Sequence, residues 1–385
     1  MVRSFVRHAW LLLALLFIHG CVSTPQVAPP ETGPPKILYE SDAWNRVDGW
    51  HGDQIQEAWN AFLNSCRAIG SKPQWLTVCA AAPGSSNARQ FFETNFTPYR
   101  IVQSTGLSQV VDSGLITGYY EPSLRGSRKP SAAFPVPLYG PPDDMLTIDL
   151  SDVFPELKGK RVRGRVQGKK VVPYYTRAEL VGQPSLKGKE LVWVENAVDA
   201  FFLEVQGSGR VQLSDGTTIR MAYADQNGQP YRSIGRYLVD RGEMTLDQAS
   251  AQSIRRWVAD HPQRKQEVLN ANPSVVFFRE ERIENPADGP KGALGVPLTA
   301  GRSLAVDPSF VPLGAPVFLA TTQPNSDAPL KRLVMAQDTG GAIRGINRGD
   351  LFWGSGTAAG ESAGRMKQQG RMWLLWPKGV ALPAQ

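Results

Sequence analysis

The stretch LTAGRSLAVDPSFVPLGAPVFLATT, residues 298–322, places short apolar runs between glycines and prolines. The same pattern extends from Gly292 through the remaining residues, where apolar side chains do not recur with the 3.6-residue period of a long helix. Short apolar runs separated by turn residues are typical of a small β-barrel or β-sandwich. We therefore expect a strand-rich C-terminal part.

The composition agrees with many turns and short strands. The chain has 37 glycines and 30 prolines among 385 residues, about 17% together, whereas average usage is near 12%. Charged residues make up 20% and hydrophobic residues 42%, which excludes a coiled coil, a long helical array and a disordered chain. The length favours two domains.

Helices and further strands are expected before this part. Apolar residues spaced by three and four predict an amphipathic helix over residues 53–69, and a helical stretch is expected over 233–270. Residues 114–120 predict a short strand that ends at a turn. Residues 191–224 are interpreted as strands, among them the run 200–206, with a tight hairpin at Ser214-Asp215-Gly216.

The N-terminal segment has the features of a secretory signal. Arg3 and Arg7 precede an apolar run that is too short to span a bilayer, and Cys21 follows it closely. We predict a signal peptide over residues 1–20 and lipidation of Cys21, as in bacterial lipoproteins; an ordinary cleaved signal is the alternative. Five prolines within residues 22–35 predict a stiff tether over residues 21–40, long enough to hold the folded part about 40 Å from a membrane.

The two remaining cysteines leave two interpretations open. Cys66 and Cys79 could form a disulfide in an oxidising periplasm, or they could remain buried free thiols.

Charge and histidine content restrict the chemistry. The net charge of +7 becomes +5 without residues 1–20, which hold two arginines and no acid. Only two histidines follow residue 20, which argues against a histidine-based zinc site, a Ser-His-Asp triad or a Cys-His pair. We expect no metal, no cofactor and no nucleic-acid partner. A basic run predicts a solvated loop or a face toward anionic wall or lipid groups; it comprises Lys158, Lys160, Arg161, Arg163, Arg165, Lys169 and Lys170.

Three aspartates of the C-terminal part, Asp307, Asp338 and Asp350, lie where an apolar run meets a turn. Partly apolar surroundings disfavour the anion and raise the pKa of a carboxyl, which can then donate a proton near neutral pH. Asp338 and Asp350 are therefore candidate acids, although an aspartate at a strand end more often shapes a turn. Asp338-Thr339-Gly340 also matches the triplet of aspartic proteases, but one copy in a chain of this length is weak support for a site that needs two carboxylates.

Seven motifs carry a resemblance to a known family. They are GYYEP at 118–122, EVQGSG at 204–209, YRSIG at 231–235, NPSVVFF at 272–278, LTAGRSLAVD at 298–307 and the segments around Asp338 and Asp350. In this order, from about residue 114 to residue 373, the chain resembles the membrane-bound lytic murein transglycosylase A family, whose C-terminal module is named for three aspartates. The first hundred residues are similar only in general character.

The resemblance implies a mainly β protein with a few helices. A double-psi β-barrel domain is expected at residues 41–122 and 287–385, and a second β-barrel domain inserted at 123–286, with a groove between the two for a glycan strand. The resemblance also implies a lipoprotein on the periplasmic side of the outer membrane, anchored through Cys21, with peptidoglycan as substrate and other cell-wall enzymes as candidate partners.

The family cleaves the β-1,4 bond between N-acetylmuramic acid and N-acetylglucosamine and leaves a 1,6-anhydro ring. Asp350 matches its single catalytic acid and Asp338 the nearby partner. One carboxyl suffices if the muramic acid's own C6 hydroxyl attacks C1 in place of water, because that nucleophile is already tethered to the sugar. A wall-binding lipoprotein without activity is the alternative function.

The resemblance also selects residues expected to line the groove. These are Tyr120, Glu121, Glu204, Gln206, Gly207, Ser208, Tyr223, Gly340, Gly341 and Phe352. For Gln206 and Ser208 the structural alternative is a turn or β-bulge, and for Tyr120 and Phe352 it is a buried core position.

Overall fold

The computed structural model describes residues 36–104, 110–158, 160 and 162–383. The predicted signal peptide, Cys21, residues 22–35 of the predicted tether and Arg161 lie outside the described residues. Residues 36–40, which we placed in the tether, belong instead to strand β1 (Lys36–Ser41), because its backbone pairs antiparallel with strand β2 (Phe96–Ser104). The Tyr39 hydroxyl also donates to the Phe310 carbonyl at 2.7 Å.

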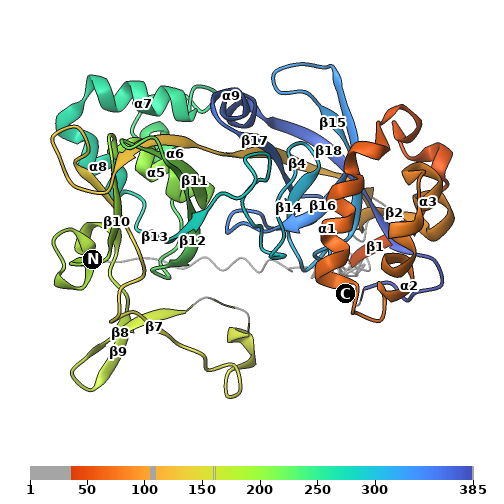
Figure 1. Cartoon of the computed structure of the whole chain (residues 1–385), viewed down its shortest axis with the longest axis horizontal. Coiled ribbons are helices and arrows are strands. Elements are labelled where there is room, and N and C mark those ends of the chain that lie inside the picture. The colour runs from red at the N-terminus through yellow and green to blue at the C-terminus, as the bar shows by residue number, and fades with distance from the viewer. Residues whose placement is uncertain (1–35, 105–109, 159, 161, 384–385) are drawn as a thin grey trace, which may run out of the picture.

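Six strands of the first sheet close into a barrel. Their order is β18, β15, β16, β14, β17, β4, and β4 pairs back onto the first half of β18 (Figure 1). Strand β2 pairs with the last residues of β18, and β1 and β3 pair with β2. The pairs β4–β17 and β14–β16 are parallel. The further bounds are β3 (Val110–Val111), β4 (Ser113–Glu121), β14 (Ser303–Val306), β15 (Pro316–Thr322), β16 (Pro329–Asp338), β17 (Gly349–Ser355) and β18 (Lys367–Pro377). The predicted closed barrel is confirmed, while its double-psi chain path stays a prediction.

Three helices cover the side of the barrel near β2. They are α1 (Trp59–Ile69), α2 (Leu76–Ala81) and α3 (Ala88–Asn95), and α1 confirms the amphipathic helix expected over residues 53–69. The rings of Phe62, Phe92 and Phe96 pack together at centroid distances of 5.0 to 5.9 Å and join the barrel interior in one core. Cys66 of α1 and Cys79 of α2 form a disulfide, which settles the choice left open above.

The inserted region forms a second sheet of six strands. Its order is β13, β12, β11, β5, β10, β6, and the end strands β13 and β6 are not paired with each other. The bounds are β5 (Ser123–Ser127), β6 (Val136–Tyr139), β10 (Glu190–Val194), β11 (Ser208–Leu213), β12 (Thr218–Gln226) and β13 (Val276–Arg282). The predicted second barrel is therefore an open sheet in the described residues, because the sheet buries its apolar side chains against helix α5 (Ala197–Gln206) instead of closing on itself.

Helix α5 corrects a second expectation. We interpreted the run 200–206 as a strand, yet it lies in α5, which begins after Asn196 and ends before Gly207. The Asn196 side chain accepts hydrogen bonds from the backbone N–H groups of Val198 and Asp199, and Gly207 adopts a left-handed conformation with φ of 79°. Both are standard ways to begin and end a helix. The hairpin at 214–216, by contrast, joins β11 to β12 as predicted.

The remaining elements make the protein mixed α/β and not mainly β. Around the second sheet lie α4 (Arg177–Leu180), α6 (Ile234–Asp240), α7 (Ala251–Asp260) and α8 (Lys265–Asn270), and α9 (Thr357–Arg365) follows β17. A third sheet of three short strands, β7 (Leu146–Thr147), β8 (Arg163–Gln167) and β9 (Lys170–Pro173), projects from the inserted region (Figure 1). None of the helices in the described ranges combines the length and apolar character needed to cross a bilayer.

Candidate active site

Strand β14 brings the two candidate acids together. Ala305 pairs with Asp338 of the parallel strand β16 on one side and with Asp350 of the antiparallel strand β17 on the other. Since neighbouring strands lie about 4.8 Å apart, the two aspartate backbones are separated by about two strand spacings. Residues that are 12 apart in the sequence are thus fixed at one level of the barrel wall.

Asp350 is half-buried, and its surroundings favour the protonated form. Burial raises the pKa of Asp350 from its ordinary value of 3.8 to about 6, and the negative charge of Asp338 adds to this rise. Two groups oppose it: the Thr117 hydroxyl donates to Oδ1 at 2.6 Å, and the positive charge of Arg348 lies nearby. Because Thr117 occupies Oδ1, Oδ2 is the oxygen that can carry an exchangeable proton.

Asp338 is held by three donors. The backbone N–H groups of Ala293 and Thr339 each donate to Oδ1 at 2.9 Å, and the Tyr119 hydroxyl donates to Oδ2 at 3.0 Å. Burial raises the pKa of Asp338, but these three hydrogen bonds lower it. Burial and the two carboxylates raise the pKa of Tyr119 well above its ordinary value, so its hydroxyl stays protonated and remains a donor. Asp350 is therefore the better proton donor of the pair.

Thr117, Tyr119 and Arg348 are site residues that our sequence reasoning did not select. Thr117 and Tyr119 lie on β4, whose parallel register places Thr117 opposite Asp350 and Tyr119 opposite Phe352. Tyr119 belongs to the GYYEP motif, which could have suggested it, but we selected its neighbour Tyr120. Nothing in the sequence indicates the contact of Thr117, because its partner lies 233 positions away.

Three residues predicted to line the groove lie near the two aspartates and have different surroundings: Phe352, Gly340 and Gly341. Phe352 is only 1% exposed and its ring lies 5.3 Å from that of Tyr119, so it supports the site from within and takes the core position named as the alternative. Gly340 and Gly341 follow Asp338 in the turn after β16, and open space surrounds the position of a side chain at Gly341. This turn is accessible to a ligand.

Tyr120 faces away from Asp350. Gly118 shares the face of β4 on which Tyr120 lies, and a Cβ there would lie 2.6 Å from the Trp353 ring and 2.9 Å from Ala363 of α9. A Cβ at Gly360 of α9 would lie 2.7 Å from the Tyr120 ring. Tyr120 and Gln206 line a cavity of about 100 Å³ between α5, α7 and α9. The Gln206 side chain accepts from the Tyr120 backbone N–H at 3.0 Å, which ties α5 to β4.

The other residues predicted to line the groove near α5 have structural roles. Gly207 ends helix α5, and Ser208 is buried at the start of β11. Glu204 binds Arg177 through both carboxylate oxygens at 2.9 and 2.8 Å and accepts from the Val276 backbone. These contacts argue against a sugar contact for Glu204. The Tyr223 carbonyl accepts from the Arg279 guanidinium, and its side chain is half-buried on β12.

Glu121 has no accessible surface, which argues against the substrate contact that we predicted. Its carboxylate receives hydrogen bonds from Arg220 at 2.5 Å, Arg210 at 2.8 Å and the Ser355 hydroxyl at 2.7 Å. Glu121 ends barrel strand β4, whereas Arg210 and Arg220 belong to the second sheet. Glu121 therefore joins the two sheets.

Asp307, the third aspartate, is 5% exposed and accepts from the backbone of Ser309 at 3.1 Å and of Gly345 at 2.8 Å. It shapes a turn, as an aspartate at a strand end commonly does.

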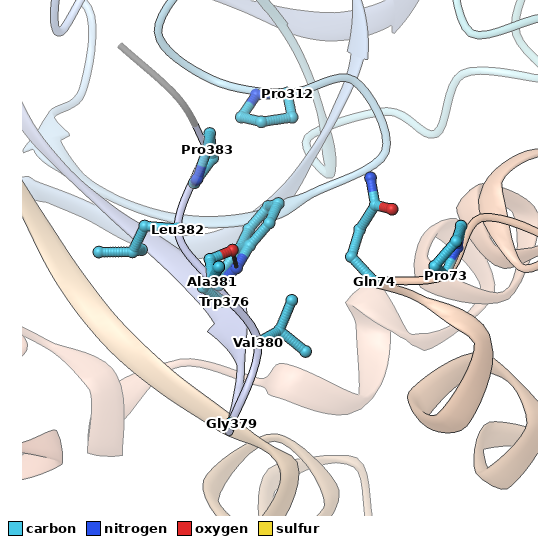
Figure 2. Close-up of a pocket in the computed structure, with 9 residues that line it drawn as sticks. All are labelled: Pro73, Gln74, Pro312, Trp376, Gly379, Val380, Ala381, Leu382 and Pro383. Atoms are coloured by element: carbon cyan, nitrogen blue, oxygen red, sulfur yellow. Dashed lines mark hydrogen bonds between the residues drawn. The ribbon is translucent and has the colours of Figure 1, made fainter.

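A larger cavity of about 550 Å³ lies apart from this site. Figure 2 shows it between the residues before α2 and those after β18, where Trp376, Pro312 and Gln74 surround it. Its lining includes no charged side chain and neither aspartate. This cavity offers no acid or base, so we place the catalytic chemistry at Asp338 and Asp350 in the barrel wall. The groove between the two sheet domains stays a prediction.

The fold and the carboxyl pair define the class of protein. Residues 302–376 match the family model described as the 3D domain, and residues 115–279 match the model described as the MltA specific insert domain. A six-stranded barrel with a sheet domain inserted in its chain is the architecture of this class. The chain belongs to the MltA family of membrane-bound lytic murein transglycosylase A proteins and is a homologue of these enzymes.

Individual relatives agree with this assignment. The membrane-bound lytic murein transglycosylase A of Vibrio cholerae is 35% identical over 269 residues, which make up 68% of this chain and 65% of that protein. The crystal structure of MltA from Neisseria gonorrhoeae gives a TM-score of 0.78 at 37% identity, covering 90% of this chain and 94% of that one. The structure of E. coli MltA with bound chitohexaose gives 0.65 at 25% identity, covering 90% and 95%.

Proposed function

We propose that this protein is a lytic transglycosylase that cleaves the β-1,4 bond between N-acetylmuramic acid and N-acetylglucosamine in peptidoglycan and leaves 1,6-anhydro ends. The observation that carries the proposal is the environment of Asp350, a half-buried carboxyl with one oxygen fixed by Thr117 and a pKa of about 6. Such a group holds a proton in an appreciable fraction of molecules near neutral pH and can donate it.

In the first step, protonated Asp350 donates from Oδ2 to the glycosidic oxygen as the bond to C1 breaks. The sugar passes through an oxocarbenium-like state whose positive charge is stabilised by nearby negative charge. Asp338 supplies that charge from β16, two strands away across β14, where its three hydrogen bonds favour the carboxylate.

In the second step, the Asp350 carboxylate removes the proton from the C6 hydroxyl, and the C6 oxygen bonds to C1. The proton lost in the first step is thereby regained, and the acid is ready for the next cycle. The nucleophile belongs to the substrate, so a second carboxylate to activate water is not required. This agrees with a site in which Asp350 is the better proton donor of the two aspartates.

The substrate and the location are proposed on related grounds. The E. coli relative binds chitohexaose, a chain of β-1,4-linked N-acetylglucosamine units, which supports a glycan ligand for this chain. We propose that the glycan lies along a groove between a barrel domain at 41–122 and 287–385 and the insert at 123–286. We further propose that lipidation of Cys21 holds the protein at the periplasmic side of the outer membrane.

The test is mass spectrometry of the products released from purified peptidoglycan by the wild type and by Asp350→Asn. We expect anhydro-muropeptides from the wild type and a loss of at least a hundredfold in the variant, because general acid catalysis contributes about that factor or more. Asp327→Asn is the matched control, since Asp327 is exposed in the loop between β15 and β16. Products with reducing ends, or binding to peptidoglycan without any product, would contradict the proposal.

A further inference from the structure

The third sheet belongs to a segment that lacks a hydrophobic core. We name residues 143–173 the arm; it contains β7, β8 and β9 and extends away from the second sheet (Figure 1). None of its described hydrophobic side chains is fully buried, and the buried core resumes at Tyr174 at the base of the arm, where Met145 packs against it. Six of its large apolar side chains are instead exposed: Leu146, Leu150, Val153, Phe154, Val166 and Val171. Exposed apolar surface concentrated in this way marks an interaction site.

The strand register places aliphatic side chains on one face of the arm sheet. Val166 lies opposite Val171, and Leu146 lies opposite Gly164, two positions before Val166. Since side chains alternate between faces, these positions share one face. A Cβ at Gly164 would lie 2.7 Å from the Ile148 side chain and 2.9 Å from that of Val171, so Ile148 covers the same face.

The opposite face of the arm sheet is mostly polar, with Val172 opposite Arg165, and is tied to the second sheet. Arg163 binds Asp225 of β12 through contacts of 2.9 to 3.1 Å, and the Arg165 guanidinium lies 4.1 Å from the centre of the Tyr175 ring. The arm sheet is therefore amphipathic, and its polar face is the one that packs on the protein. The aliphatic face is left accessible, the reverse of what folding in water alone favours.

Four lysines lie at the hairpin end and before β8; by the register, Lys170 pairs with Gln167 and lies on the polar face, next to the turn. Lys169 and Lys170 lie at the turn between β8 and β9, where Gly168 has φ of 59°, and Lys158 and Lys160 precede β8. All four are exposed, and no carboxylate of the described residues lies within 4.0 Å of any of them. The acidic side chains of the arm belong to the segment before Lys158, so the hairpin of β8 and β9 carries positive charge only.

We propose that the hairpin end of the arm docks on an anionic lipid surface, with Val166 and Val171 inserted at the headgroup level and Lys169 and Lys170 against the phosphates. Aliphatic side chains flanked by unpaired lysines are the combination that binds such an interface. A glycan strand is the less suitable occupant, because the aliphatic face has no aromatic ring to stack on a sugar. The proposal goes beyond the proposed function and needs only a periplasmic location, not the activity of Asp350.

The test is co-sedimentation of the mature chain, residues 21–385 with Cys21→Ser, with vesicles. All described elements lie after residue 35, so this form retains them. We expect binding to phosphatidylethanolamine vesicles that contain phosphatidylglycerol, and much weaker binding to pure phosphatidylcholine. Lys169→Gln with Lys170→Gln should weaken binding about 25-fold, at about fivefold for each lysine, and reduce its dependence on salt. Val166→Thr with Val171→Thr should weaken it about tenfold, while keeping residues that favour a strand.

Matched controls are Val181→Thr and Lys265→Gln, exposed residues outside the arm that should leave binding unchanged. Unaltered melting temperatures and unaltered release of anhydro-muropeptides would show that the arm variants are folded. Equal binding to neutral vesicles, or equal losses in the controls, would overturn the proposal. Arm-dependent self-association without vesicle binding would overturn it as well, and would assign the face to a second copy of the chain.

Discussion

Asp350→Asn should stabilise the protein at neutral pH while it removes activity. The substitution keeps the shape of the side chain, and its Oδ1 can still accept from the Thr117 hydroxyl. The pKa of Asp350 is about 6 in the folded protein, against 3.8 ordinarily, so the folded state holds this proton more tightly than the unfolded chain does. At pH above about 6 the ionised carboxyl therefore costs the fold about 3 kcal/mol, at 1.36 kcal/mol for each pH unit.

The sign of this effect determines its dependence on pH. The contribution of Asp350 to stability is intact below about pH 4 and is lost as the pH rises through 6. The amide has no such loss, so the advantage of Asp350→Asn should be full at pH 7.5 and close to zero at pH 4. For a protein of this size, about 3 kcal/mol corresponds to a rise in Tm of roughly 4 °C.

The assay is thermal unfolding, followed by circular dichroism, of both proteins at the two pH values. Asp307→Asn is a control with the opposite sign, because the amide nitrogen would face one of two backbone N–H donors and cost about 1 to 3 kcal/mol. An Asp350→Asn protein that is no more stable than the wild type at pH 7.5, or that gains stability only in acid, would refute the argument that burial holds the proton on Asp350.

Three further predictions concern other contacts. Thr117→Val removes a hydrogen bond that favours the charged form of Asp350, so the pH at which kcat/KM falls should rise by about one pH unit. The measurement is product release between about pH 4 and 8, with Ser113→Ala as the control. Replacement of both Cys66 and Cys79 by serine should lower the free energy of unfolding by about 3 kcal/mol in denaturant titrations, since 13 positions separate them; an unchanged midpoint would contradict this. Glu121→Gln should cost about 3 to 5 kcal/mol by the same measurement, because the buried Arg220 and the half-buried Arg210 lose their counter-charge, and a neutral result would show that Glu121 does not join the sheets.

Local signals in the sequence predicted several elements of the fold. The strand at 114–120, the hairpin at 214–216 and the amphipathic helix ending near Ile69 all depend on side-chain periodicity or turn residues within a few positions. The run 200–206 was misinterpreted because its apolar residues occupy most positions, which leaves no period to distinguish a buried helix from a strand. Asn196 and Gly207 held the information, as residues that begin and end helices.

The candidate site was predictable in its acids but not in its contacts. Asp338 and Asp350 could be selected from their motifs, yet their common partner Ala305 follows from strand register, which joins segments that are distant in the sequence. For Glu121, by contrast, the motif led to a role that its contacts argue against. It belongs to a motif of the family, but its burial depends on Arg210 and Arg220, 89 and 99 positions away, and this changes it from an expected ligand into a structural residue.

Strand β4 joins features that have so far been treated separately. Its first residues close the barrel against β18, its middle carries Thr117 and Tyr119, and its last residue is Glu121, with only Pro122 before β5 of the second sheet. Ile116 and Thr117 pair with both β17 and β18, whereas the later residues of β4 pair with β17 alone. One short strand therefore carries both the hydroxyl that lowers the pKa of Asp350 and the carboxylate that joins the two sheets.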